Sequence, residues 1–139
     1  TNQLERDILL AEGAADEALE LFRKAPLVPL LVTNLDTMSQ RNLPYVEDFP
    51  ARAYLLKGDT AKAVAEYERL TGPDPVPRNH LLIFPAVRVR LAELYEKTGQ
   101  KAKAVAEYER VLALYPHADA DLPEMGTAKA RLAALKAAE

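Results

Sequence analysis

The sequence predicts an all-α fold built as an α-solenoid, and three observations predict it. First, 24 Ala and 22 Leu make up about a third of the 139 residues, and both cost little in a helix. Second, ten prolines exclude one long uninterrupted bundle, because proline ends or kinks a helix. Third, a segment of the chain recurs at a fixed spacing, which is typical of repeat architectures. We therefore expect short helical hairpins stacked on one another.

The repeat is clearest between residues 58–70 (GDTAKAVAEYERL) and 99–111 (GQKAKAVAEYERV), which are identical at ten of thirteen positions and lie 41 residues apart. A weaker copy occupies residues 13–25 (GAADEALELFRKA). Apolar residues recur at helical spacing on both sides of each glycine, so each copy predicts a helix, a tight turn and a second helix. The expected hairpins span about residues 2–25, 43–71 and 80–115.

Local signals place the turns inside these hairpins. Gly58 and Gly99 stand where a left-handed C-cap is expected, Thr60 follows as an N-cap, and Pro116 ends the last hairpin. The small Ala that opens each apolar stripe, such as Ala104, lets the paired helices approach closely. Since one hairpin cannot bury its apolar face alone, we expect the hairpins to stack.

A further helix is expected at about residues 122–138. Met125, Ala128 and Leu132 continue an apolar stripe there, and Asp121 with Glu124 has the spacing of a capping box. A helix that is polar on one side suits the end of a stacked array. We expect this helix to cap the array and residues 1–139 to form a single domain.

The third copy resembles the tetratricopeptide repeat in its Leu91-Ala92 pair, Tyr95, Gly99, Ala104 and Tyr108, followed by Pro116. The second copy keeps the small and aromatic positions, and the first keeps only Ala18, Phe22 and Ala25. The resemblance implies a right-handed solenoid of about three such hairpins plus the capping helix. The order of the segments is also similar to C-terminal repeat regions of multidomain bacterial proteins, so we expect the chain to be a fragment of a larger protein.

In arrays of this family the first helix of each hairpin lines a concave groove that holds a partner peptide. The resemblance therefore implies a non-catalytic scaffold that binds a partner peptide or domain in this groove. Carried over position by position, the groove residues are Tyr45, Asp48, Phe49, Arg52, Leu55, Leu56, Ala86, Val89, Arg90, Glu93, Glu96 and Lys97. As an alternative, Phe49, Leu55 and Leu56 belong to the core beneath the long first connection.

The residues themselves predict no catalytic site, metal site or cofactor. The chain has no Cys, its single Ser39 has no His nearby, and His80 and His117 lack a partner at helical ligand spacing. The carboxylate pairs Glu66/Glu68 and Glu107/Glu109 recur in both close copies. We interpret them as a solvated outer face rather than as acid and base groups.

Charge and hydropathy also bear on the partner. A net charge of −3 gives no electrostatic attraction to nucleic acid or to an anionic membrane. The most apolar stretch, residues 27–35, is far shorter than the roughly 20 residues of a membrane-spanning helix. We expect a cytoplasmic protein whose partner is another protein or another domain of the parent chain.

The apolar stretch within the connection 26–44 leaves one alternative open. It can pack across the first hairpin, or it can serve as a docking or dimerisation segment. In the second case the array is a homo-oligomerisation module, and a homodimer is expected.

Overall fold

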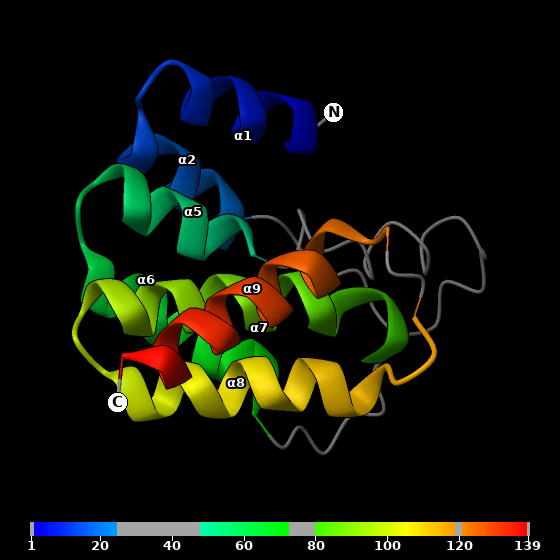
Figure 1. The fold of residues 1–139 in the computed structure, drawn as a ribbon. Helices are drawn as coiled ribbons and strands as arrows, with labels where there is room; N and C mark the ends of the chain where they lie inside the picture. Colours follow the sequence, from blue (N-terminus) through cyan, green and yellow to red (C-terminus); the bar gives the residue numbers. More distant parts are fainter. Residues whose placement is uncertain (1, 25–47, 73–79, 119–120, 139) are drawn as a thin grey trace. The chain divides into compact units, whose positions relative to one another are not determined.

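The structure is a computed structural model that describes residues 2–24, 48–72, 80–118 and 121–138. Within these residues it contains seven helices and no strand (Figure 1). The helices are α1 (Asn2–Ala11), α2 (Ala15–Lys24), α5 (Phe49–Leu56), α6 (Thr60–Thr71), α7 (His80–Lys97), α8 (Lys101–Leu114) and α9 (Pro123–Ala137). The predicted all-α fold of helical hairpins followed by a closing helix is confirmed.

The chain divides into two compact units, residues 1–66 and 67–139, with the boundary inside α6. Among the described helices, none combines the length and the hydropathy that a membrane span requires. The predicted segment 27–35 lies outside the described residues.

Glycine makes the tight turn of each hairpin, as the sequence predicts. Gly13, Gly58 and Gly99 have φ angles of 82°, 76° and 75°, in the left-handed region. Their N–H groups and those of the next residues donate to carbonyls of the last helical turn, for example from Gly99 to Glu96 at 3.1 Å. These bonds satisfy carbonyls that the end of the helix leaves unpaired.

Two predicted helix caps are wrong. The carboxylate of Asp59, not the hydroxyl of Thr60, accepts a hydrogen bond from the backbone N–H of Lys62 at 3.1 Å, and Thr60 is already the first residue of α6. At the other helix, α9 begins at Pro123 after Leu122, without a side-chain cap, so Asp121 does not form a capping box. In the first case the charged acceptor suits the positive end of the helix dipole better than a hydroxyl does.

In the first unit, α2 packs between α1 and α5. Ala15 and Leu19 of α2 and Ala53 of α5 are at most 4% exposed, and Leu10 and Tyr54 pack against them. The guanidinium of Arg23 reaches the hydroxyl of Tyr54 at 3.4 Å, and the ammonium of Lys62 lies 5.6 Å from the centre of the same ring. Two cations, Arg23 and Lys62, thus contact the tyrosine that packs against this cluster.

In the second unit, α7 and α8 pack along each other as a hairpin, and α9 packs against both (Figure 1). Ala92 of α7 and Ala104 of α8 have no exposed surface. The rings of Tyr95 and Tyr108 are at most 4% exposed, because they fill the space beside these small residues. The predicted pairing of a small residue with an aromatic one is therefore what packs this hairpin.

Glu107 corrects the prediction of a solvated outer face. Its side chain is only 8% exposed and accepts from Arg88 of α7 at 2.8 Å and from Arg110 at 2.7 Å. Arg88 also donates to the carbonyl oxygen of Thr71 at 3.2 Å. A buried carboxylate is tolerated when hydrogen bonds and opposite charges compensate its lost hydration. Glu107 thus ties α8 to α7 inside the unit.

Glu96, near the end of α7, holds α9 in place. It accepts from the hydroxyl of Tyr108 at 2.7 Å and from both Nε and Nη2 of Arg131, the former at 3.0 Å. The hydrogen bond from Arg131 lowers the pKa of Glu96, and the bond from Tyr108 lowers it further, while burial opposes both. Burial and the nearby carboxylate raise the pKa of Tyr108, so its hydroxyl stays a donor at neutral pH.

Contacts between consecutive hairpins repeat at the same spacing as the sequence. Tyr95 of α7 donates to Glu68 of α6 at 2.5 Å, and 41 residues further on Lys136 of α9 donates to Glu109 of α8 at 2.7 Å. Glu68 and Glu109 are equivalent residues of the second helices of two consecutive hairpins. Each therefore accepts a hydrogen bond from the helix that follows its hairpin.

The glycine turns give the first testable prediction. Gly99→Ala and Gly58→Ala should each lower the free energy of unfolding by about 1 kcal/mol, because an L side chain is strained at positive φ. A Cβ at either position meets no atom within 4 Å, so packing does not contribute. Gly126→Ala is the matched control, since Gly126 is helical with equally open space, and it should raise stability by about 0.5–1 kcal/mol. Urea denaturation measures all three, and equal effects at Gly99 and Gly126 would contradict the assignment.

The contact between Glu96 and Arg131 gives a pH prediction. Because the pKa of Glu96 is lowered in the folded chain, its contribution is complete above its usual value of 4.5 and is lost as pH falls through the folded value. Glu96→Gln should therefore lower the melting temperature near neutral pH and flatten its decline as pH falls from about 5 to about 3.

Glu109→Gln is the control for this pH series. Its ion pair with Lys136 also joins α8 to α9, but both side chains are about half exposed, so its removal should change stability by less than about 1 kcal/mol. An acid transition of the same steepness in wild type and in Glu96→Gln would show that Glu96 is not the group that titrates.

Candidate functional site

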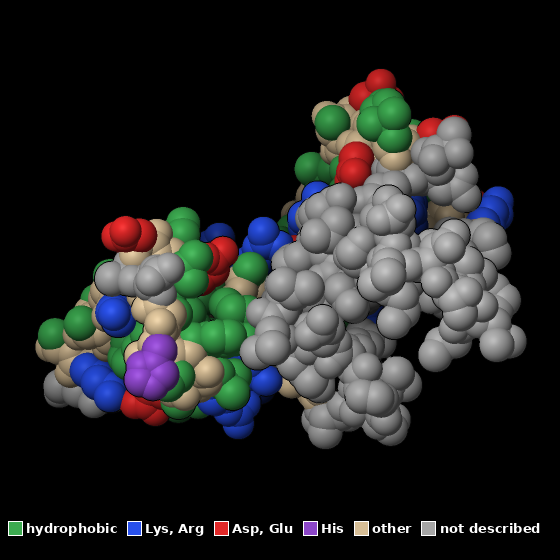
Figure 2. Space-filling view, turned by 90° about the vertical axis from the view of Figure 1, so that its right-hand side faces the viewer, with side chains coloured by type: hydrophobic (Ala, Val, Ile, Leu, Met, Phe, Trp, Pro, Cys, Tyr) green, Lys and Arg blue, Asp and Glu red, His purple; other side chains and the backbone are tan. Residues whose placement is uncertain are grey.

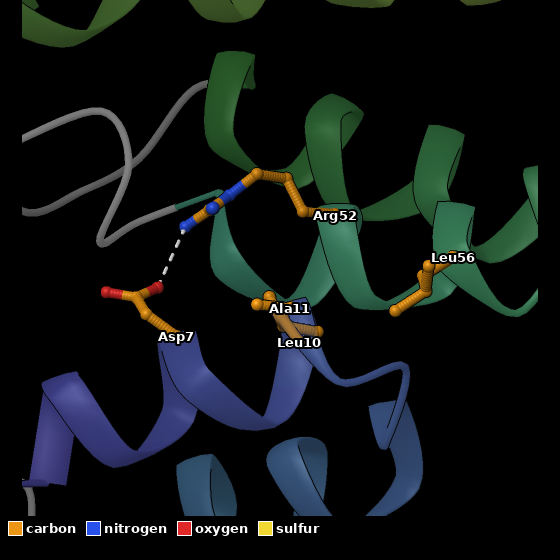
Figure 3. A pocket seen from close by; sticks show the side chains of 5 residues that line it. All are labelled: Asp7, Leu10, Ala11, Arg52 and Leu56. Carbon is orange, nitrogen blue, oxygen red and sulfur yellow. Dashed lines mark ion pairs between the residues drawn. The ribbon is translucent and has the colours of Figure 1, made fainter.

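The first unit contains a hollow of about 450 Å³ between α1 and α5. Figure 3 shows its lining: Asp7, Leu10 and Ala11 come from α1, and Arg52 and Leu56 come from α5. These are the first helices of two consecutive hairpins. The volume is within the range of sites that hold a small ligand or a few side chains of a peptide.

Ion pairs hold the guanidinium of Arg52 at this hollow. Asp48 immediately precedes α5 and has no exposed surface, and Arg52 follows it by one helical turn. Nε of Arg52 donates to Oδ1 of Asp48 at 3.1 Å, which leaves the planar group directed toward α1. There Nη2 lies 3.7 Å from Oδ1 of Asp7, the pair drawn as a dashed line in Figure 3.

Two stacked aromatic rings support the same region. Phe22 of α2 and Phe49 of α5 lie 5.5 Å apart with an interplanar angle of 11°. The guanidinium of Arg6 lies 5.2 Å from one ring centre and 5.6 Å from the other, and that of Arg52 lies 5.7 Å from Phe49. Such cation–π contacts contribute roughly 0.5–2 kcal/mol each. They join α1, α2 and α5 around the hollow.

The groove residues predicted in the second hairpin separate into three groups. Arg52 and Leu56 line the hollow, and Leu55 is 38% exposed without lining it. Asp48 and Phe49 are buried. The alternative that placed Phe49, Leu55 and Leu56 in the core therefore holds for Phe49 but not for the two exposed leucines. Tyr45 lies outside the described residues.

The residues predicted in the third hairpin are less uniform. Arg90 and Lys97 are exposed, and Ala86 and Glu93 are partly exposed. Val89 is only 6% exposed and faces the interior. Glu96 accepts hydrogen bonds from Tyr108 of α8 and Arg131 of α9. Glu96 therefore has a structural contact where the resemblance implied a groove position.

Sequence reasoning missed the three lining residues of α1. The residues carried over from the family came only from the second and third copies, because the first copy keeps few of the family positions. The signal was nevertheless present, since Asp7 and Ala11 lie one turn apart on the first helix of the first hairpin. That is the position from which Arg52 and Leu56 reach the hollow.

The lining combines one anion, one cation and three apolar side chains. Within the residues that the structure describes, no three His, Asp or Glu side chains gather as metal ligands would. On the face that Figure 2 shows, basic and acidic side chains lie interspersed with hydrophobic ones outside the grey region. The lining of the hollow thus offers apolar contact together with a charge of each sign.

A protein-family model matches part of the chain. The family model described as "Tetratricopeptide repeat" matches residues 85–118, which contain most of α7, all of α8 and Pro116. No curated protein and no solved structure matched the chain. Repeats of this family generally mediate protein–protein interaction and are typically non-catalytic. Residues 85–118, which form most of the α7–α8 hairpin, thus match a tetratricopeptide repeat.

Proposed function

We propose that this chain is a non-catalytic scaffold that binds a peptide of a partner protein in the hollow between α1 and α5. The observation that carries the proposal is the lining of that hollow, which comes from the first helices of two consecutive hairpins and includes Arg52 and Leu56. The cytoplasmic localisation of the protein stays a prediction.

The geometry of Arg52 supports recognition of a carboxylate. Its bond to the buried Asp48 is short at 3.1 Å, whereas its contact with the half-exposed Asp7 is longer at 3.7 Å. A peptide carboxylate can compete for the second contact without disturbing the first, and Arg is well suited to paired hydrogen bonds with carboxylates. An apolar side chain of the same peptide would pack on Leu10, Ala11 and Leu56.

The exposed and partly exposed positions of α7 extend the proposal to the second unit. Arg90 and Lys97 provide cations, and Ala86 and Glu93 provide a small and an acidic contact. We propose them as a separate set of partner contacts within the second unit.

The sharpest test uses Leu56→Asp, because Leu56 lines the hollow and is 51% exposed. A phage-displayed random peptide library is selected on the wild-type chain, and the enriched peptides are measured by calorimetry. Leu56→Asp should weaken their binding by about tenfold or more, since it removes an apolar contact and places a carboxylate near the peptide's own. The melting temperature should stay within about 3 °C of wild type, because the side chain is exposed.

Leu114→Asp is the matched control, since Leu114 of α8 is an equally exposed leucine outside the hollow. It should leave the affinity for the same peptides unchanged. Arg52→Glu is a poorer test, because it also places a second carboxylate beside the buried Asp48. If no peptide is enriched, or if both leucine variants bind as wild type does, the hollow is not the binding site.

Self-association is a second candidate function, and the exposure of Leu4 (68%) and Ile8 (46%) on α1 favours it. These residues are one turn apart and form an exposed apolar face of that helix. Light scattering over a concentration series separates the two proposals: a stable mass of 15.4 kDa supports the peptide scaffold. A dimer that is lost in the double variant Leu4→Glu, Ile8→Glu supports self-association.

A further inference from the structure

Helix α9 repeats the sequence and the placement of α7. Residues 131–135 read RLAAL and residues 90–94 read RLAEL, which are identical at four of five positions at the spacing of the repeat, 41. The contacts have the same spacing, since Glu68 accepts from Tyr95 and Glu109 accepts from Lys136. By sequence and by contact, α9 therefore occupies the place that the first helix of a hairpin takes against the preceding hairpin.

The two helices differ in what covers them. In α7, with α8 packed along it, Leu91, Ala92 and Leu94 are at most 5% exposed. In α9 the equivalent Ala133 is exposed, and Leu132 and Leu135 are only partly buried. The face that α8 occupies on α7 is thus open on α9 within the part of the chain that the structure describes.

Charge on the open face specifies what fits it. On α7, Arg88 pairs with the buried Glu107 of α8 at 2.8 Å. The equivalent residue of α9 is Lys129, which is exposed, and no carboxylate in the described ranges forms an ion pair with it. A helix that packs as α8 does would bring a glutamate to this lysine.

A second position shows how the occupant must differ from α8. In the α7–α8 hairpin, the ammonium of Lys103 lies 5.1 Å from the ring centre of Tyr95. On α9 the place of Tyr95 is taken by Lys136, and a lysine opposite it would be repelled. The fitting helix therefore has an acidic residue where α8 has Lys103.

We propose that the face of α9 formed by Lys129, Leu132, Ala133 and Lys136 binds an amphipathic helix of a partner protein, in the manner in which α8 packs on α7. The partner helix has a small residue at the place of Ala104 and an aromatic one four residues later. It has glutamates at the places of Lys103 and Glu107. This face belongs to the second unit, whereas the hollow between α1 and α5 belongs to the first.

The probe is a fluorescein-labelled synthetic peptide with the sequence of residues 99–116 and the change Lys103→Glu. Titration with the full chain, followed by fluorescence anisotropy, should give saturable binding with one peptide per chain. The peptide with the natural Lys103 should bind about tenfold more weakly, because it faces Lys136. A peptide that also carries Tyr108→Ala should lose binding, because it lacks the aromatic residue that fills the space beside Ala104 in the α7–α8 hairpin.

Chain variants locate the binding face. Ala133→Arg should weaken binding by about tenfold or more through steric obstruction, while Ala106→Arg, at an exposed alanine of α8, should not. Lys129→Glu should weaken binding of the probe, and a probe with Glu107→Lys should restore it, which a purely structural effect of the variant would not do. The absence of saturable binding, wild-type affinity of Ala133→Arg, or no rescue by the charge swap would each overturn the proposal.

Discussion

The packing of the helical hairpins depends on fully buried alanines at the contacts between paired helices. Ala18, Ala63 and Ala104, each in the second helix of its hairpin, are fully buried, as is Ala92 in the first helix of the third. At such a position even a few added methylene groups would force the helices apart, at a cost of about 1–3 kcal/mol. Because the backbones approach closely at the alanines, a wedge opens beside them, and Tyr67 and Tyr108 fill it with almost no exposed surface.

This packing brings tyrosine hydroxyls and carboxylates to the junctions between helices. Tyr108 donates to Glu96, and Tyr95 donates to Glu68, so each buried ring has a polar end that reaches a neighbouring element. Arg131 completes the cluster at Glu96 and fixes the position of α9. Buried hydrogen-bonded groups of this kind contribute little net energy, but an incorrect register would leave them unpaired. They therefore select one arrangement of α7, α8 and α9.

The candidate peptide site in the first unit follows from the same construction with weaker packing. Its first helix has fewer of the family's apolar positions, and Leu10 packs against the core only partly buried. The space left between α1 and α5 is edged by Asp7 and Arg52, whose contact is looser than the one between Arg52 and Asp48. One arginine thus contacts both the buried Asp48 and the partly exposed Asp7.

The sequence by itself determined the helical class, the positions of the hairpins and the glycine turns. These features depend on local helix propensity and on an internal repeat that the amino-acid sequence shows directly. The family resemblance, rather than local propensity, suggested Arg52 and Leu56 as groove residues, and both line the hollow. Only the tertiary structure decided the environment of each charged residue. Glu66 and Glu107 are equivalent in sequence, and Glu107 is nevertheless buried because Arg88 and Arg110 converge on it from two helices. Likewise, Glu96 belongs to a junction with α9 and Asp7 to the hollow, since distant segments set their neighbours.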